Sequence, residues 1–175
     1  MAAAAAAALT APPAFALDNT AAPVHEAAAV GLKAAAHAVY VNPLEAGDIH
    51  SIDYNKLYPG LFKPTTGVDF IATKGTPVHA VTDGEIVHSA WDPRFGHQVV
   101  IRQADGHYSQ YGRLLSERLV KVGEKLVAGQ TVGFVGASGI DFAQGPGLHF
   151  EIRTGENPDS HIDPVPYMAE HGVVI

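Results

Sequence analysis

The sequence of 175 residues contains no cysteine. Disulfide bonds and thiolate metal sites are therefore excluded, and a metal ion would have to bind histidine, aspartate or glutamate side chains. Basic residues are also scarce: 11 lysines and arginines stand against 18 aspartates and glutamates, which gives a formal net charge of −7. A nucleic-acid-binding protein normally presents a basic face, so that class is disfavoured. No apolar run reaches the ~18 residues that a membrane-spanning helix needs, so no membrane span is expected.

The amino-terminal residues are rich in alanine. Residues 2–8 are all alanine, and small residues at Ala14 and Ala16 fit a signal-peptidase site after Ala16. The positively charged segment that begins a signal peptide is missing, so residues 1–16 are interpreted as the remnant of a longer signal peptide. A plain low-complexity tail is the alternative. The first interpretation predicts a secreted or cell-wall-associated protein.

Residues 17–48 remain rich in alanine, and a helix over residues 24–40 is compatible with their helix-forming composition. The apolar face of such a helix would be mostly alanine and would pack weakly, so residues 17–48 are predicted to be a linker or a loose helix. The folded domain is expected to occupy residues 49–170. At its end we expect residues 163–168 to run along the domain edge, anchored by Tyr167 and Met168.

Short segments that alternate between apolar and polar residues fill the chain from residue 67 onward. Asp83-Gly84 and Asp105-Gly106 are strong hairpin-turn signals. Strands separated by frequent turns, with no long helical pattern between them, indicate an antiparallel all-β domain. The expected strands cover residues 67–72, 76–81, 85–90, 97–102, 108–111, 120–122, 131–135 and 148–152.

Two glycine-punctuated segments, residues 75–87 and 123–133, weakly resemble each other. Such strands also occur in biotinyl and lipoyl carrier domains, which are β-sandwiches. A carrier domain presents a lysine at the tip of a tight hairpin, and neither Asp-Gly turn contains one. The carrier function is therefore disfavoured.

The last predicted strand carries one histidine on its polar face. After the break at Gly145-Pro146, Leu148, Phe150 and Ile152 face one way, and the side chains between and after them face the other. Those polar residues are His149, Glu151 and Arg153.

Read together with Gly67-Val68-Asp69-Phe70, this stretch resembles the last motif of the lysostaphin-type (LytM-like) zinc endopeptidases, which cut peptide bonds in the bacterial cell wall. In that family the stretch reads Gly-Pro-His-Leu-His-Phe-Glu. Further similarities occur in order between residues 60 and 165, among them Gly75-Thr76-Pro77-Val78 and Tyr111-Gly112-Arg113-Leu114. The resemblance implies an all-β fold, an antiparallel two-layer β-sandwich of the LytM/lysostaphin type.

The family's chemistry uses a zinc ion with three protein ligands and an open position, where the pKa of bound water falls to about 7. The resemblance places two of these ligands on Asp69 and His149. The remaining ligand position, four residues before Asp69, is Thr65, whose neutral hydroxyl is a poor zinc ligand. His50, in the loop before the domain, is a weak candidate for a substitute. Zinc, the family's cofactor, is therefore expected to be absent or weakly bound here.

The resemblance also implies two catalytic histidines, and both are replaced. One position is Arg113, which stays protonated and cannot act as a base. The other is Gly147, which has no side chain. No catalytic residue is assigned, since losing one general acid or base typically costs ~10² to 10⁴ in rate.

Two functions follow from this resemblance. The first is a catalytically inactive module that binds the cell wall or regulates a wall hydrolase, with peptidoglycan or its stem peptides, and a cell-wall amidase, as partners. The alternative is a zinc metalloendopeptidase that cleaves peptidoglycan peptide bonds with an altered metal site.

A last expectation concerns the position of the metal. Asp69 and Arg113 both point toward it in the family fold, and a guanidinium can satisfy a carboxylate through two hydrogen bonds. We therefore expect an Arg113–Asp69 ion pair with His149 beside it. The alternative has Arg113 facing solvent and Asp69 held by backbone amides.

Overall fold

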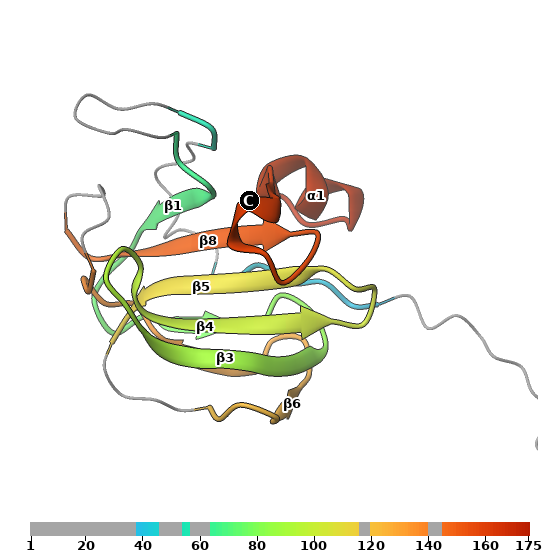
Figure 1. Cartoon of the computed structure of the whole chain (residues 1–175), viewed down its shortest axis with the longest axis horizontal. Helices are drawn as coiled ribbons and strands as arrows, with labels where there is room; N and C mark the ends of the chain where they lie inside the picture. The colour runs from blue at the N-terminus through green and yellow to red at the C-terminus, as the bar shows by residue number, and fades with distance from the viewer. Residues whose placement is uncertain (1–37, 46–53, 57–63, 116–119, 140–144) are drawn as a thin grey trace, which may run out of the picture. The chain divides into compact units, whose positions relative to one another are not determined.

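A computed structural model of the chain describes residues 38–45, 54–56, 64–115, 120–139 and 145–175 (Figure 1). The proposed signal-peptide remnant, most of the possible helix over residues 24–40, and His50 lie outside the described residues. No helix within the described ranges is long and apolar enough to cross a membrane.

The described residues form nine strands and two short helical segments. In chain order these are β1 (Val68–Ile71), β2 (Pro77–His79), β3 (Gly84–Asp92), β4 (Gly96–Gln103), β5 (Tyr108–Leu114), β6 (Lys125–Leu126), β7 (Thr131–Phe134), β8 (Gly147–Arg153), the 3₁₀ segment η1 (Pro158–Ser160), β9 (His161–Ile162) and α1 (Pro164–Glu170).

Seven strands make the main sheet, in the order β1-β8-β5-β4-β3-β6, with β9 paired to β8. Figure 1 shows β8, β5, β4 and β3 side by side. A second sheet consists of β2 and β7. Each of these strand pairs is antiparallel, which confirms the all-β, antiparallel prediction.

The core lies on the apolar face of the main sheet. Phe70, Phe150 and Tyr111 are fully buried there, together with Val78 and Val132 of the second sheet. The hydroxyl of Tyr111 accepts a hydrogen bond from the Val81 backbone N–H, at 2.9 Å, and so connects β5 to the chain that leaves β2. The opposite face of the main sheet carries buried polar residues, among them Asp69, His149 and Glu151.

One predicted hairpin is confirmed and the other is wrong. Asp105-Gly106 lies in the connection between β4 and β5, where Gly106 has φ 92°, a conformation that favours glycine. Asp83-Gly84 does not join a hairpin, because β2 pairs with β7 while β3 pairs with β4 and β6. The chain crosses there from one sheet to the other. The strand expected at residues 120–122 is also absent, and the nearby strand is β6.

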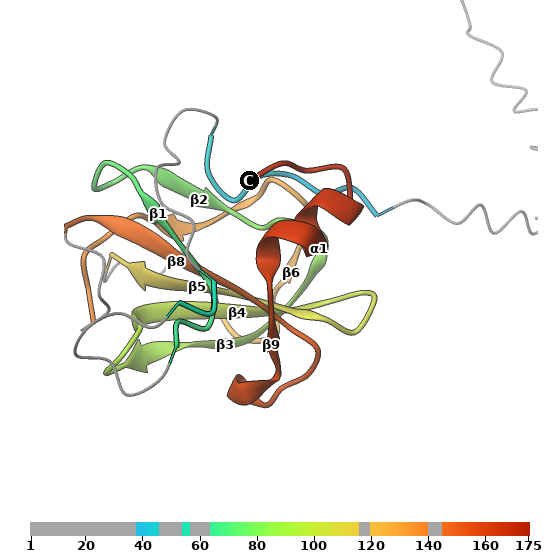
Figure 2. The ribbon, with the colours of Figure 1, turned by 90° about the horizontal axis from the view of Figure 1, so that it is seen from above.

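The two ends of the described chain meet beside the main sheet. Helix α1 begins after Asp163, whose side chain accepts a hydrogen bond from the Val165 N–H, and it contacts β8 (Figure 2). Tyr167 and Met168 are buried, which confirms them as anchors. Tyr40 donates or accepts a hydrogen bond with the Tyr167 hydroxyl at 3.0 Å.

Candidate functional site

Strands β1 and β8 bring Asp69 and His149 together. The two residues are direct partners in the antiparallel register. Because neighbouring residues of a strand point to opposite faces, burial of Phe70 and Phe150 in the core turns Asp69 and His149 to the polar face.

The imidazole of His149 lies between two carboxylates. Its Nδ1 is 3.0 Å from Asp69 Oδ1, and its Nε2 is 3.1 Å from Glu151 Oε1. Ionised carboxylates only accept hydrogen bonds, so both contacts are satisfied when both ring nitrogens carry a proton. The ring of Phe95 stacks on the imidazole with centroids 4.8 Å apart. Gly112, opposite His149 on β5, leaves room for this stack, because a Cβ there would lie 3.2 Å from Phe95 Cβ.

Glu151 is the centre of the buried charges. It accepts hydrogen bonds from the Thr66 hydroxyl and from Arg153 Nε, the latter at 2.8 Å. Burial alone would raise the pKa of Glu151, but the hydrogen bond and charge of His149 and the charge of Arg153 outweigh it and lower the pKa to about 2. Glu151 therefore stays ionised beside His149.

Thr65 is buried and binds the backbone of a preceding segment. Its Oγ1 accepts from the Lys56 N–H at 3.0 Å and lies 3.3 Å from the Lys56 carbonyl oxygen, to which it can donate. The backbone of Thr65 bonds to the same segment through Asn55 and Lys56. The hydroxyl at this first ligand position thus fastens residues 55–56 to the start of β1.

Arg113 is buried and does not pair with Asp69, so the expected ion pair is wrong. Its backbone has φ 65°, and its N–H donates to the Phe95 carbonyl at 2.6 Å. Its guanidinium donates to the Gly145 carbonyl at 2.5 Å. The reason is that Asp69 already has a partner, His149, directly across the strand pair. The alternative, with Arg113 in solvent, is also wrong, since only 3% of the residue is exposed.

Gly147 sits where strands leave no room for a side chain. It pairs with Ile71 on β1 and forms a bridge with Gly136 on its other side. A Cβ at Gly147 would lie 2.5 Å from the Phe70 carbonyl oxygen. A histidine would therefore require the backbone to shift.

The described residues do not form a three-ligand zinc site. Within the described ranges no three His, Cys, Asp or Glu side chains are placed to hold a metal ion. Asp69 and His149 bind each other, and the Thr65 hydroxyl binds Lys56. Since zinc sites normally need three or four protein ligands, these residues do not fit the ion in this arrangement.

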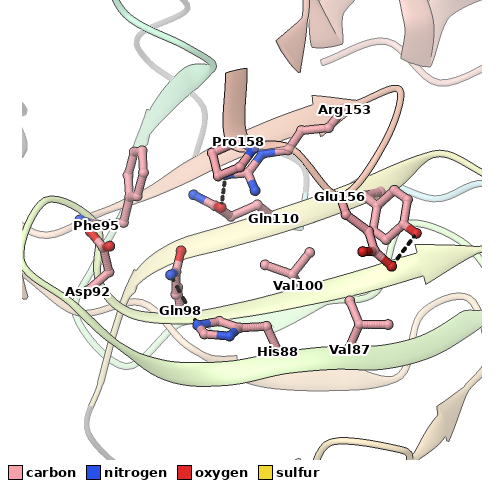
Figure 3. Close-up of a pocket in the computed structure, with 11 residues that line it drawn as sticks. Val87, His88, Asp92, Phe95, Gln98, Val100, Gln110, Arg153, Glu156 and Pro158 are labelled. Atoms are coloured by element: carbon pink, nitrogen blue, oxygen red, sulfur yellow. Dashed lines mark hydrogen bonds between the residues drawn. The ribbon is translucent and has the colours of Figure 1, made fainter. Parts of the chain in front are cut away.

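The alternation along the last predicted strand puts Glu151 and Arg153 on the polar face without indicating a role for them. The structure makes them part of the site. Along β8 every second residue after Gly147 is polar, and that alternation is the signal that could have identified the set. On the same face, beside this cluster, lies a pocket of about 370 Å³ (Figure 3). Arg153, Gln110, Gln98 and Phe95 contribute to its wall.

Comparison with known proteins gives a consistent result. The model of peptidase family M23 matches residues 63–164. The chain is 36% identical over 108 residues to the glycyl-glycine endopeptidase ALE-1 of Staphylococcus capitis, which covers 61% of this chain and 29% of that protein. It is 37% identical over 99 residues to the peptidoglycan DD-endopeptidase ShyC of Vibrio cholerae, covering 55% of this chain and 22% of that protein. The chain thus spans less than a third of the length of these curated relatives.

Solved structures resemble the same region. The catalytic domain of lysostaphin from Staphylococcus simulans superposes with a TM-score of 0.59 at 32% identity, covering 69% of this chain and 90% of that one. A zinc-containing peptidase from Vibrio cholerae superposes with a TM-score of 0.58 at 28% identity, covering 66% of this chain and 36% of that one.

Proposed function

The chain belongs to peptidase family M23, and from this premise we propose that its domain binds peptidoglycan peptides without cutting them. In this proposal the protein is secreted and acts at the cell wall, either as a wall-binding module or as a regulator of a wall hydrolase such as an amidase.

One observation carries the proposal: both nitrogens of His149 are engaged by carboxylates, Asp69 and Glu151. A zinc ligand needs a deprotonated ring nitrogen, so zinc would have to displace a proton and one of these buried contacts. The residues at the catalytic histidine positions, Arg113 and Gly147, supply neither a base nor an acid at neutral pH. Without cleavage, peptide binding is the function that remains for the polar face of the main sheet.

The ligand class is taken from the relatives. Their names identify a glycyl-glycine endopeptidase and a peptidoglycan DD-endopeptidase, so both relatives act on peptide bonds, and the second acts on those of peptidoglycan. The polar face of the main sheet offers a pocket next to the His149 cluster in which such a peptide can lie.

A zinc endopeptidase with an altered site is the second candidate. It is favoured by the presence of Asp69 and His149 side by side on one face, at two of the positions where the family has ligands. The third ligand and both acid/base groups would then have to come from other residues.

Three measurements on the purified chain separate these functions. After dialysis against a mild chelator, elemental analysis should find less than one zinc per chain. After incubation with sacculi, chromatography of muropeptides should show no cleavage product. The protein should also co-sediment with sacculi. Stoichiometric zinc together with chelator-sensitive cleavage would overturn the proposal in favour of the second candidate. Failure to co-sediment would contradict the wall-binding function.

Secretion is tested by fractionating cells that express the chain with and without residues 1–16.

A further inference from the structure

A continuous line of buried polar side chains connects Asp69 to the pocket. It runs from Asp69 to His149 at 3.0 Å, from His149 to Glu151 at 3.1 Å and from Glu151 to Arg153 at 2.8 Å. Arg153 then donates through Nη2 to Gln110 Oε1 on the neighbouring strand β5. All five residues are more than nine-tenths buried. Burying five polar side chains costs free energy unless they hydrogen-bond to one another, so such a network suggests a functional role. The role we infer lies at Gln110, where the line ends.

The line determines the orientation of the Gln110 amide. A guanidinium can only donate hydrogen bonds, so the Gln110 oxygen must face Arg153 and the amino group must face away from it. Gln110 is 1% exposed, and its Nε2 has no hydrogen-bond partner among the described residues. An unsatisfied buried N–H is rare in native proteins because it is costly. This one belongs to a residue of the pocket wall (Figure 3).

A second unsatisfied atom lies on the next strand. Gln98 of β4 also belongs to the pocket wall, and its Nε2 is 3.3 Å from His88 Nε2. Its Oε1 has no hydrogen-bond partner in the part of the chain that the structure describes. The pocket therefore offers one donor and one acceptor, from amides on adjacent strands, in the same wall as the apolar side chains of Val87 and Val100 (Figure 3).

The charges around the pocket favour a neutral ligand group. The positive charge of Arg153 is balanced by Glu151 at 2.7 Å. Asp92 accepts hydrogen bonds from two backbone N–H groups, and Glu156 accepts one from the Tyr108 hydroxyl. Arg153 is the only lysine or arginine among the described residues that line the pocket, and its pairing with Glu151 leaves the wall without a free guanidinium for a carboxylate or phosphate. A peptide group, which has one C=O acceptor and one N–H donor, matches the two amides.

We propose that the pocket binds a peptide group of the ligand, with Gln110 donating to its carbonyl oxygen and Gln98 accepting from its N–H. Both protein atoms are almost wholly covered in this structure, so the ligand reaches them only when neighbouring side chains of the pocket wall move aside, while Gln110 keeps its bond to Arg153. The proposal rests on the proposed function, and it assigns to the buried line from Asp69 to Arg153 the role of holding Gln110 in the donor orientation.

The test uses two variants with the same change of charge. Gln110→Glu keeps the oxygen that pairs with Arg153 but replaces the donor by an acceptor. Gln98→Glu keeps the acceptor. Binding of soluble muropeptides, prepared by digesting sacculi with a muramidase, is measured by calorimetry. We expect Gln110→Glu to weaken the apparent affinity by about tenfold or more and Gln98→Glu to change it by less than about threefold.

A second measurement needs only the wild-type chain. The side-chain amide signal of Gln110, identified by its loss in Gln110→Glu, should shift in ¹⁵N nuclear magnetic resonance spectra when muropeptides are added, and should not shift with glycan strands stripped of peptide. Three outcomes would overturn the inference: equal affinities for wild type and Gln110→Glu, a Gln110 signal that does not move, or an equal shift with bare glycan. In each case, binding of the wild-type chain to sacculi would still support the proposed function. Absence of any binding by wild type would overturn both.

Discussion

The imidazole of His149 lies 3.0 Å from the carboxylate of Asp69, its direct partner across the β1–β8 pair. The side chains at the two positions where the sequence resemblance predicts zinc ligands thus satisfy each other. Glu151 and Arg153 continue the alternation of negative and positive charge along the same face. This arrangement compensates buried charges without a metal ion, whereas removing one partner of a buried pair typically costs ~3–5 kcal/mol.

The first prediction concerns the metal. Thr65→His should raise the affinity for zinc, because it restores an imidazole at the first ligand position, beside Asp69 and His149. The variant also loses the hydrogen bonds between Thr65 Oγ1 and Lys56, so a lower melting temperature without zinc is expected. Titration with a zinc-sensitive dye, competing with the protein, measures the affinity.

Thr65→Val is the control for that variant, since it removes the same hydroxyl without adding a ligand. Equal zinc affinity in the two variants would show that position 65 does not reach the metal position. Thr65→His should still leave muropeptides uncut, because Arg113 and Gly147 remain in place.

The second prediction concerns Gly147. Gly147→Ala should destabilise the domain by about 1–3 kcal/mol, because its Cβ would lie 2.5 Å from the Phe70 carbonyl oxygen and the two strands would have to separate. Gly155→Ala is the matched control: the nearest atom to its Cβ would be Ser160 Oγ at 3.9 Å. Urea denaturation compares the two. Equal stabilities would mean that β1 and β8 adapt freely.

This result changes what reconstruction of the enzyme requires. Replacing Thr65, Arg113 and Gly147 by histidine together would restore the family's residue types. At Gly147 the Cβ of the new side chain would clash with the backbone of Phe70. Restoring the enzyme would therefore require a wider β1–β8 spacing in addition to the three histidines.

The alternation of apolar and polar residues made much of the fold predictable. It placed Phe150 in the core and His149 on the polar face, and a strand fixes both assignments by its period of two. Which strands pair with each other was harder to predict from the sequence. Asp83-Gly84 has the composition of a hairpin turn, but the partners of β2 and β3 are chosen by packing between sheets, which a local pattern does not encode.

The placement of Asp69 and His149 on one face could be predicted from the sequence, but their contacts could not. Asp69, His149 and Arg113 were expected to lie together, and the choice of partner for Asp69 depends on register and backbone conformation. The left-handed φ of Arg113 and the direct pairing of Asp69 with His149 are both tertiary facts. Gln110 gave no signal, because its importance comes only from Arg153 on a neighbouring strand.

The third prediction separates the side chain of Arg113 from its backbone. Both Arg113→Ala and Arg113→Gly remove the hydrogen bond from the guanidinium to the Gly145 carbonyl. With φ 65°, alanine keeps the left-handed strain that glycine avoids. Arg113→Gly should therefore be more stable than Arg113→Ala by about 1 kcal/mol. Lys125→Ala, on the exposed side of β6, gives the reference for a surface change. An alanine variant as stable as the glycine variant would show that the backbone relaxes.

The last prediction concerns Tyr111 and alkaline pH. Its fully buried hydroxyl accepts from the Val81 N–H and donates to Ser109 Oγ at 3.2 Å. Burial raises the pKa of Tyr111 from 10.0 to about 12, so the folded state keeps the proton to higher pH than the unfolded state does. The stabilisation is complete below pH 10 and is lost as the pH rises toward 12, because only the unfolded chain then gains from ionisation.

Comparing wild type with Tyr111→Phe isolates the contribution of Tyr111 ionisation to the free energy of unfolding, because all other titratable groups are present in both proteins. Below pH 10 the variant should be less stable by about 1–3 kcal/mol, because Val81 N–H loses its buried acceptor. Between pH 10 and 12 the gap between the two proteins should narrow or reverse, by up to roughly 2–3 kcal/mol. Urea denaturation at pH 8, 10 and 11 measures the difference. A difference that stays constant over this range would mean that Tyr111 ionises as readily in the folded domain as in the unfolded chain, and that its hydroxyl is accessible to water.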